Sequence, residues 1–275
     1  MKPIRNVTVG ADPEVFLLNR GSNIPRSAEG LFGGTKEKPK PMEGLPNGFF
    51  IQEDNVSAEF NIPPANSMNE FMTSIALALK YTAKIAAKNK CRLALVPDLD
   101  FPKDQLATKH AQTLGCDPDF NIWTETDNPR PVPPELMRTA AGHVHIGWEK
   151  PDWEQVSLVG RFFDVHVTLP SILVTDKNRR RELYGKAGAC RPKKYGIECR
   201  AVDNFWLQKK GWIAHTYNAV MELVDELNLN APIVGEMLAD YSGMIVQAIN
   251  NHDKEMAFDL CHRFGVKLYP GKYAD

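Results

Sequence analysis

Hydrophobic and polar residues alternate along several short segments in the first two-thirds of this 275-residue chain. Alternation predicts strands, because successive side chains of a strand point to opposite faces of a sheet. The segments predicted as strands are residues 7–18, 49–52, 56–62, 91–96, 120–124, 140–148 and 195–202. Two long segments lack the pattern. Residues 21–48 are rich in Gly, Pro, Ser and Lys and predict a long binding or covering loop, and residues 99–134 are expected to be mostly irregular.

Helical spacing of apolar residues dominates the end of the chain. A first helix is predicted from Ser67, which can form a capping box with Glu70, to about residue 89. Further helices are predicted at residues 153–174, 211–228, 234–250 and 253–264. Because crossover helices do not regularly separate the strands, the pattern indicates an α+β fold with a mainly antiparallel sheet. Residues 1–275 are expected to form a single domain whose C-terminal part, about residues 207–275, is helical.

Composition and charge exclude some classes of protein. The chain has 33 Lys and Arg residues against 34 Asp and Glu residues, so a general nucleic-acid or membrane binder is not expected. No apolar run approaches the roughly 18 residues of a membrane span, and the N-terminus lacks the apolar core of a signal peptide. The five cysteines are scattered without a Cys-x-x-Cys pair, which favours a reducing cytoplasm.

Closely spaced carboxylates mark two of the predicted strands. Asp12 and Glu14 would share one strand face, where they would repel each other unless a cation neutralises them. On an edge strand the same pair would simply face solvent. Glu53, Asp54 and Glu59 lie on or beside another strand, and the face of Glu59 is polar throughout. That face suits either water or a metal cavity.

A His-x-His pair lies on a third predicted strand. His143 and His145 point to the same side, while Val144 and Ile146 face the core. Such pairs commonly bind metal or contact phosphate, and the alternative is two surface histidines on a sheet face.

The segment from residue 183 to residue 206 combines a strand with many basic residues. Glu198 and Arg200 share one face of the predicted strand, and Ile197 and Cys199 share the other. The basic residues before or near the strand, expected to lie in a mobile loop, are Arg179, Arg180, Arg181, Lys186, Arg191, Lys193 and Lys194. A carboxylate beside such a loop suits a metal–phosphate site. The alternative is a solvated basic loop before an edge strand with a surface ion pair.

These candidates together contain many carboxylates and few nitrogen ligands, which favours Mg²⁺, with Mn²⁺ as the alternative, over zinc. Magnesium beside Arg and Lys side chains indicates a nucleoside triphosphate. The sequence has neither a P-loop nor a kinase-type glycine-rich loop, so the nucleotide would be bound in another way.

The ordered motifs resemble the glutamine synthetase and glutamate–cysteine ligase superfamily. They are Asp12-x-Glu14, Asp54 to Glu59, Gly142-His143-x-His145 and Glu198-x-Arg200. Within that superfamily, the chain is similar to the phage-associated carboxylate–amine ligases called COOH·NH2 ligase type 2. The likeness includes Gly-Cys-Asp-Pro-Asp-Phe at residues 115–120 and Tyr-Gly-Lys-Ala-Gly at residues 184–188, and it spans about residues 9–206.

The resemblance implies a curved antiparallel sheet of the glutamine synthetase type, backed by helices, whose concave face holds divalent ions beneath ATP. The metal ligands that it implies are Glu14, Glu59, His143 and Glu198, with Asp12 and Asp54 as further ligands. The side chains expected to contact the nucleotide or its phosphates are His145, Arg200, Lys186 and Arg181. The expected catalytic residues are Arg200, Lys186 and Arg191, and the last two would meet either phosphate or a substrate carboxylate.

The resemblance also implies the reaction. ATP would convert a substrate carboxylate to an acyl phosphate, and an amine would then attack it to form an amide or peptide bond. Expected partners are small-molecule or peptide acids and amines, without nucleic acid or membrane, and a homo-oligomer is possible. The expected location is the cytoplasm, that of the host if a phage encodes the chain. Two alternatives remain, which are a phosphotransferase on the same sheet and a non-catalytic metal- or nucleotide-binding structural protein.

Overall fold

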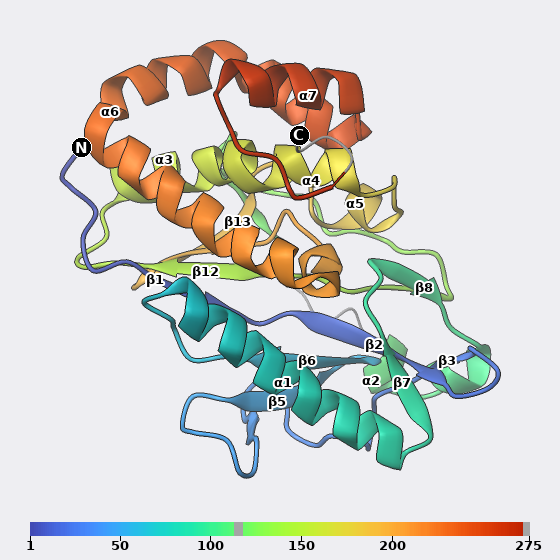
Figure 1. The fold of residues 1–275 in the computed structure, drawn as a ribbon. Coiled ribbons are helices and arrows are strands. Elements are labelled where there is room, and N and C mark those ends of the chain that lie inside the picture. The colour runs from blue at the N-terminus through green and yellow to red at the C-terminus, as the bar shows by residue number, and fades with distance from the viewer. Residues whose placement is uncertain (113–117, 272–275) are drawn as a thin grey trace.

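A mixed α/β architecture, in which helices cover a curled antiparallel sheet, is seen in the computed structural model (Figure 1). The structure describes residues 1–112 and 118–271. The strands are β1 (Thr8–Ala11), β2 (Glu14–Asn19), β3 (Pro25–Arg26), β4 (Lys40–Pro41), β5 (Phe50–Asp54), β6 (Ser57–Asn61), β7 (Cys91–Ala94), β8 (Asp98–Asp100), β9 (Phe120–Asn121), β10 (Thr126–Asp127), β11 (Met137–Thr139), β12 (Val144–Gly147), β13 (Ala189–Lys193) and β14 (Gly196–Cys199).

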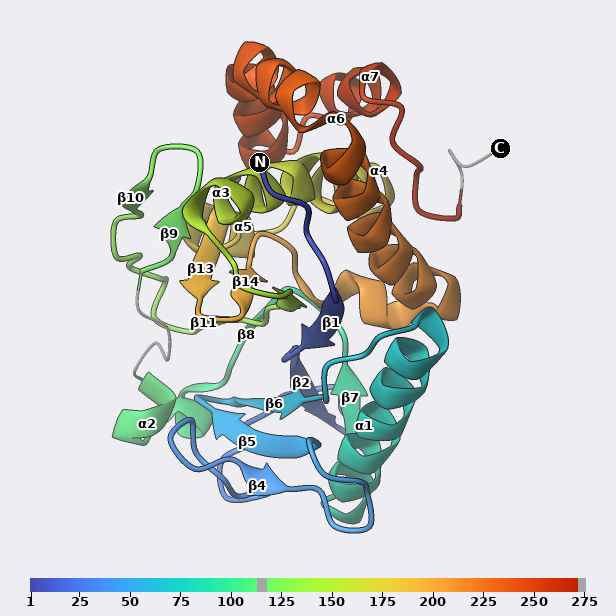
Figure 2. The ribbon, with the colours of Figure 1, turned by 90° about the vertical axis from the view of Figure 1, so that its left-hand side faces the viewer.

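Most helices form a layer on one side of the strands, and α1 (Met68–Lys88) lies separately beside β5, β6 and β7 (Figure 2). The other α-helices are α2 (Lys109–Gln112), α3 (Trp153–Phe163), α4 (Leu169–Val174), α5 (Arg180–Leu183), α6 (Lys210–Asn251) and α7 (Lys254–Arg263). A π-helical turn, Asp164–Thr168, joins α3 to α4. Helix α1 packs on β6 and β7, whereas α3 packs on β14, and α6 contacts both helices.

Twelve of the strands form two six-stranded antiparallel arrangements that meet at one bend, and β8 and β11 form a separate antiparallel pair. The first has the order β1-β12-β14-β13-β9-β10, and the second has the order β3-β2-β6-β5-β4 with β7 also paired to β2. The chain passes from one to the other at Asp12–Pro13, between β1 and β2. Across this bend, Phe60 N donates to Pro13 O at 3.2 Å and Ile62 N donates to Ala11 O at 3.1 Å. The segment after β6 therefore follows both strands and joins them into one curled surface.

The bend corrects the prediction of a single strand over residues 7–18. Pro13 has no N–H for a strand ladder, so regular pairing is interrupted there. The next residue, Glu14, donates its N–H to Ala141 O at 2.9 Å, which ties the start of β2 to the approach to β12. As a result Asp12 and Glu14 do not lie on one continuous strand face, and each joins a different group of side chains.

The predicted helices are present, with differences in detail. Ser67 caps α1 by accepting from Glu70 N at 3.3 Å, but the Glu70 carboxylate accepts from Asn66 N at 2.9 Å, so the predicted capping box is half formed. The two helices predicted on either side of residue 230 are present as the two halves of α6, which non-helical backbone at Asn230 separates as a kink. Pro232 explains the kink, because it lacks the N–H that a regular helix needs.

The helix from Trp153 to Val174 corrects the expectation that no segment has the length and hydropathy of a membrane span. Its composition meets both criteria, yet 89% of its most apolar window is buried inside the fold. That degree of burial is what a core helix has. Gly160 faces the sheet, where a methyl group in its place would lie 2.8 Å from Ile197 Cδ1, so the glycine allows α3 to approach β14 closely.

Several short elements were not expected from the sequence. Strands β3 and β4 lie in the predicted loop of residues 21–48, and β8, α2 and β10 lie in the segment expected to be mostly irregular. Strand β13 lies in the segment expected to be a mobile basic loop, and its residues from Cys190 to Lys193 pair with β14. Short strands of this kind depend on a partner strand that is distant in sequence, so local alternation gives little signal for them.

We expect Gly142→Ala to destabilise the fold by about 1–3 kcal/mol because the site leaves no room for a methyl group. The added carbon would overlap Asp203 O and lie 2.6 Å from Trp206 Nε1, next to the hydrogen bond of 3.1 Å from that indole to Gly142 O. Chemical denaturation measures the change. The control is Gly243→Ala on α6, where no atom lies within 4 Å of the added carbon and a gain of about 0.5–1 kcal/mol is expected. Equal stability of the two variants would contradict this packing.

Candidate functional site

Strand register places the candidate side chains on one face of the first sheet. His145 on β12 lies opposite Glu198 on β14, which in turn lies opposite Arg191 on β13. Side chains of directly opposed residues point to the same face of a sheet. The alternate residues Ile146 and Ile197 are fully buried in the core on the other face. The predicted orientations of the His-x-His and Glu-x-Arg motifs are therefore confirmed.

One candidate cation site consists of Asp12, His143 and Glu198, which we call the histidine group. One ligand atom from each residue lies within 4.8 Å of the others. His143 Nδ1 is 3.3 Å from Asp12 Oδ1 and 3.8 Å from Glu198 Oε1. His145 stands beside the group, with its Nε2 2.8 Å from Asp12 Oδ1 and its Nδ1 hydrogen-bonded to the Tyr195 hydroxyl.

Basic side chains already compensate the carboxylate of Glu198. Arg200 donates to it, Lys193 Nζ lies at 2.8 Å and Arg191 Nη1 at 3.6 Å. Burial alone would raise the pKa of Glu198, yet the charges of Arg200 and His143 lower it to about 2. Burial and Arg200 lower the pKa of His143 to about 4, so its imidazole is neutral at pH 7 and able to bind metal.

Asp12 and His145 form a second charge pair at the edge of the histidine group. Burial acts against the charge on each side chain, but their mutual attraction prevails. It lowers the pKa of Asp12 and raises the pKa of His145. His143 Nε2 is buried without a hydrogen-bond partner, an unusual state for a polar atom that a bound ion or ligand would relieve.

The other candidate cation site consists of Glu14, Asp54 and Glu59, which we call the carboxylate group. Its ligand atoms also lie within 4.8 Å of one another. Glu14 and Glu59 are direct partners across β2 and β6, and Asp54 ends the neighbouring strand β5. Glu14 Oε2 accepts from Ala141 N at 2.8 Å, which fixes the side chain from the β12 side. The strand pairing thus directs three carboxylates to one point.

No basic side chain forms an ion pair with this carboxylate group within the part of the chain that the structure describes. Burial, with the charge of Asp54, raises the pKa of Glu14 to about 7. Burial also raises the pKa of Asp54, and it raises that of Glu59 well above its ordinary value with help from Asp12 and Asp54. Three buried carboxylates are costly unless a cation offsets their repulsion. Oxygen-only donors suit Mg²⁺ or Mn²⁺, so these residues fit a hard divalent ion.

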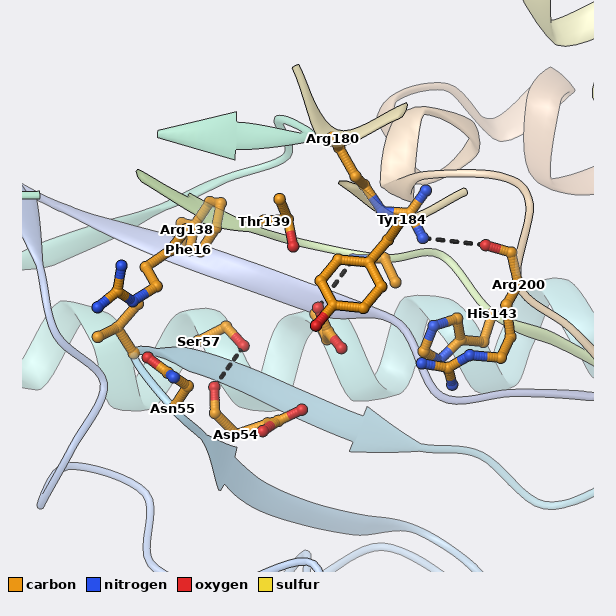
Figure 3. Close-up of a pocket in the computed structure, with 13 residues that line it drawn as sticks. Phe16, Asp54, Asn55, Ser57, Arg138, Thr139, His143, Arg180, Tyr184 and Arg200 are labelled. Atoms are coloured by element: carbon orange, nitrogen blue, oxygen red, sulfur yellow. Dashed lines mark hydrogen bonds between the residues drawn. The ribbon is translucent and has the colours of Figure 1, made fainter. Parts of the chain in front are cut away.

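Both groups border one cavity (Figure 3). Glu14 and Asp54 line it from the carboxylate group, and His143 lines it from the histidine group. Three arginines complete the polar lining, namely Arg138, Arg180 and Arg200. The cavity therefore places two candidate cation sites and several guanidinium groups around one space, where a phosphate or carboxylate could be held.

Arg200 lies between the histidine group and Asp119 and contacts both. It is 3% exposed, its Nε donates to Asp119 Oδ1 at 2.6 Å, and its Nη1 lies 3.2 Å from His143 Nδ1. Asp119 belongs to the predicted Gly-Cys-Asp-Pro-Asp-Phe motif, of which residues 115–117 lie outside the described residues. The contact by which Asp119 orients Arg200 was not predicted from that motif.

The basic segment is not the solvated loop before an edge strand that one interpretation predicted. Strand β14 lies between β12 and β13, so it is not an edge strand. Arg180 and Arg181 are 3% and 6% exposed, so they do not belong to a solvated loop. Arg181, expected to contact the nucleotide, donates instead to Gly185 O at 2.9 Å and does not line the cavity, whereas its neighbour Arg180 does. Lys186 is half-buried on the loop after α5.

Glu53 has a structural role in place of the metal-binding role considered for it. Its carboxylate accepts three backbone N–H groups of the preceding loop, from Gly30 at 2.8 Å, Phe32 at 2.8 Å and Gly33 at 2.7 Å. Part of the predicted long loop is thereby fixed against β5. Arg138, Arg180 and Tyr184 were not predicted as site residues, and Arg138 is an isolated residue with no motif around it.

Cys190 and Cys199 lie close to the site but are poor nucleophiles. Both thiols are buried, and burial raises the pKa of each above its ordinary value. A thiol of raised pKa is protonated at neutral pH and reacts slowly.

Comparison with known proteins gives little beyond the architecture. No protein-family model matches the chain, and no curated protein is similar in sequence. Among 84 similar chains in solved structures is GmaS, a gamma-glutamylmethylamide synthetase, in a complex with ADP. The similarity to GmaS has a TM-score of 0.39 at 12% identity and covers 79% of this chain and 55% of that one. This chain spans about half the length of GmaS, and a likeness at this level assigns neither family nor activity.

We expect Mg²⁺ or Mn²⁺ to raise the melting temperature, by about 5 °C near 100 times the dissociation constant. The pKa of Glu14 is about 7 in the folded state against an ordinary value of 4.5, so the metal-free fold loses stability as pH rises between them. Metal binding requires deprotonated carboxylates, so the gain should be larger at about pH 8 than at about pH 5. Differential scanning fluorimetry measures both effects.

Glu59→Gln should remove most of this metal-dependent gain, and His143→Ala should weaken binding at the other group. Glu149→Gln, an exposed residue after β12, is the matched control. A metal response that is the same in all four proteins would contradict both candidate sites.

Proposed function

We propose that the protein is an ATP- and Mg²⁺-dependent ligase that joins a carboxylate to an amine, on a catalytic domain of the glutamine synthetase type. The observation that carries the proposal is the pair of candidate cation sites beside one arginine-lined cavity. One of the two groups has three converging carboxylates without an ion-pair partner among the described residues. Glu14 and Glu59 are buried and Asp54 is half-buried, a charge arrangement that favours divalent ions. Arginines beside such ions suit a nucleoside triphosphate.

The residues proposed to hold Mg²⁺ are Glu14, Asp54 and Glu59 in the carboxylate group and Asp12, His143 and Glu198 in the histidine group. When bound there, the ions would supply charge neutralisation for phosphate oxygens. The compensated carboxylate of Glu198 has a low pKa and stays ionised at neutral pH, as a ligand must.

The chain's own cations would act on the reacting groups. Arg200 is held by Asp119 and Glu198, so its guanidinium is preorganised beside His143 and costs little reorganisation when charge develops on a phosphoryl group. Arg180 lines the same cavity, held by the carbonyl groups of Arg200 and Ala201. His145, Lys186 and Arg191 are proposed as further contacts to the nucleotide or to the substrate acid.

The proposed reaction has two bond-exchange steps. An oxygen of the substrate carboxylate attacks the γ-phosphorus of ATP, forming an acyl phosphate as ADP leaves. The amine nitrogen then attacks the acyl carbon, phosphate leaves, and the nitrogen loses a proton to give the amide.

A phosphotransferase would use the same cation sites, and its product distinguishes it. A ligase should release phosphate much faster when an amine is present, whereas a kinase leaves a stable phosphorylated product. Screening acid–amine pairs for phosphate release by the wild type, with mass spectrometry of the products, separates the two. Retained ATP binding without turnover of any pair would support the non-catalytic alternative.

We expect ATP, or a slowly hydrolysed analogue, to bind only in the presence of Mg²⁺, and Glu198→Gln to abolish that binding. The variant removes the negative charge around which His143, Lys193 and Arg200 are arranged. Calorimetric titration with and without Mg²⁺ measures the affinity, and Glu149→Gln should bind as the wild type does. If no nucleotide binds to the wild type under any metal condition, the ligase proposal loses its mechanism.

Arg200→Ala should lower kcat by about 100- to 1,000-fold, as expected for loss of one preorganised donor to developing charge. The thermal response to Mg²⁺ should persist, because the carboxylate group does not include Arg200. Arg200→Lys should recover only part of the rate, because an ammonium cannot reproduce the fork of contacts to Asp119 and Glu198. Unchanged rate and ATP affinity in the alanine variant would count against this role.

A further inference from the structure

A short loop, residues 184–188, connects α5 to β13 at the edge of the candidate site. Its first residue, Tyr184, lines the cavity together with Arg180. Gly185 and Gly188 have φ angles of +71° and +76°, which L residues with side chains rarely adopt. Lys186 stands between them, half-buried, and its ammonium forms no hydrogen bond or ion pair with any residue that the structure describes. The loop therefore carries both a cavity wall and a cation open to a ligand.

Side chains from the helical layer hold the backbone of this loop. Arg181 Nη1 donates to Gly185 O at 2.9 Å, and Ala187 N donates to Asn250 Oδ1 at 2.9 Å. Asn250 comes from the end of α6, far along the chain. The peptide groups on both sides of Lys186 are thus held by hydrogen bonds to side chains of α5 and α6.

Asp164 makes the most buried of these contacts. It lies in the π-helical turn between α3 and α4, and it is 1% exposed. Its Oδ2 accepts from Gly188 N at 2.6 Å and from Trp123 Nε1 at 2.7 Å. One carboxylate oxygen therefore ties the loop to the chain segment after β9. A π-helical turn changes the direction of side chains within a helix, and such turns are often found at functional sites.

The contact at Gly188 leaves little freedom on the other side of the loop. Gly188 O accepts from Ile122 N at 3.0 Å. A methyl group on Gly188 would lie 2.6 Å from both Asn121 Oδ1 and Trp123 Cδ1. The end of the loop is therefore enclosed between Asp164 and the segment around Trp123, and a change at Asp164 would release it on one side only.

We propose that Asp164 is a positioning residue for the active site. It fixes residues 184–188 so that Tyr184 and Lys186 meet the bound substrates in one geometry, without itself touching them. This inference rests on the proposed ligase function. Preorganised loops of this kind remove the cost of ordering at each turnover, and small displacements of positioned groups reduce rates strongly.

The first test is amide hydrogen exchange of residues 184–188, followed by mass spectrometry, on the unliganded protein. We expect Asp164→Ala to raise the exchange rate of this segment by about tenfold or more, because Gly188 N loses its acceptor. Asp164→Asn should keep most of the protection, because both donors meet a single oxygen that an amide carbonyl can replace. Trp123→Phe removes the indole donor to Asp164 and leaves the Gly188 contact, so residues 184–188 should stay protected. This second measurement remains available if Asp164→Ala does not fold.

The second test separates positioning from general destabilisation. With Asp164→Ala, kcat should fall by about 10- to 100-fold and the KM for ATP should rise, while the metal response of the carboxylate group persists. Asp164→Asn should restore most of kcat. The control is Asp152→Ala, which removes the N-cap acceptor of Gln155 N at the start of α3 and should lower stability without changing either constant.

Two results would overturn the inference. Unchanged exchange of residues 184–188 in Asp164→Ala would show that Asp164 does not hold the loop. Raised exchange with unchanged kcat and KM would show that the loop geometry does not matter to the reaction. A wild type that neither binds nor uses ATP would instead overturn the proposed function and with it the catalytic role of Asp164, whereas the exchange experiment would still report on the loop contact.

Discussion

The arrangement of the site is constrained by electrostatic repulsion among carboxylates that the fold brings close together. Glu14, Asp54 and Glu59 converge because β2, β5 and β6 are neighbouring strands, and no basic side chain among the described residues pairs with them. Burial and the charge of Asp54 raise the pKa of Glu14 to about 7, against the attraction of Arg200 and Arg180. A fold can carry such a cluster only if protons or cations neutralise it, so the arrangement is costly for stability and suited to binding a metal.

The two candidate cation sites differ in how their charge is balanced. Around Glu198, basic side chains from β13 and β14 offset the carboxylate within the protein, and its pKa is low. Around Glu59, protons or a bound cation would have to neutralise the negative charge of the carboxylates. The carboxylate group, whose negative charge has no ion-pair partner among the described residues, would be preformed for a cation. The arginines beside it would remain available for an anionic ligand.

The helical layer also serves the site. It buries the apolar face of β12 and β14, and through Arg181, Asn250 and Asp164 it holds the loop that ends in β13. Stability and the proposed chemistry are therefore coupled through contacts that are distant in sequence. One face of the sheet packs against the helices and the other faces the site. Alternate residues of one strand, such as Ile197 and Glu198, therefore have different environments.

Alternation and spacing in the sequence predicted most long elements and marked the candidate carboxylates and histidines, and the family resemblance then implied the six residues that lie in the two groups. These features are local, because neighbouring residues on a strand or helix have fixed relative directions. Which residues join which group was decided by the tertiary structure. The bend at Pro13 separates Asp12 from Glu14, and the central position of β14 buries Glu198 and Arg200. The roles of Asp119, Asp164 and Arg180 likewise depend on contacts between segments far apart in the chain, which no local pattern encodes.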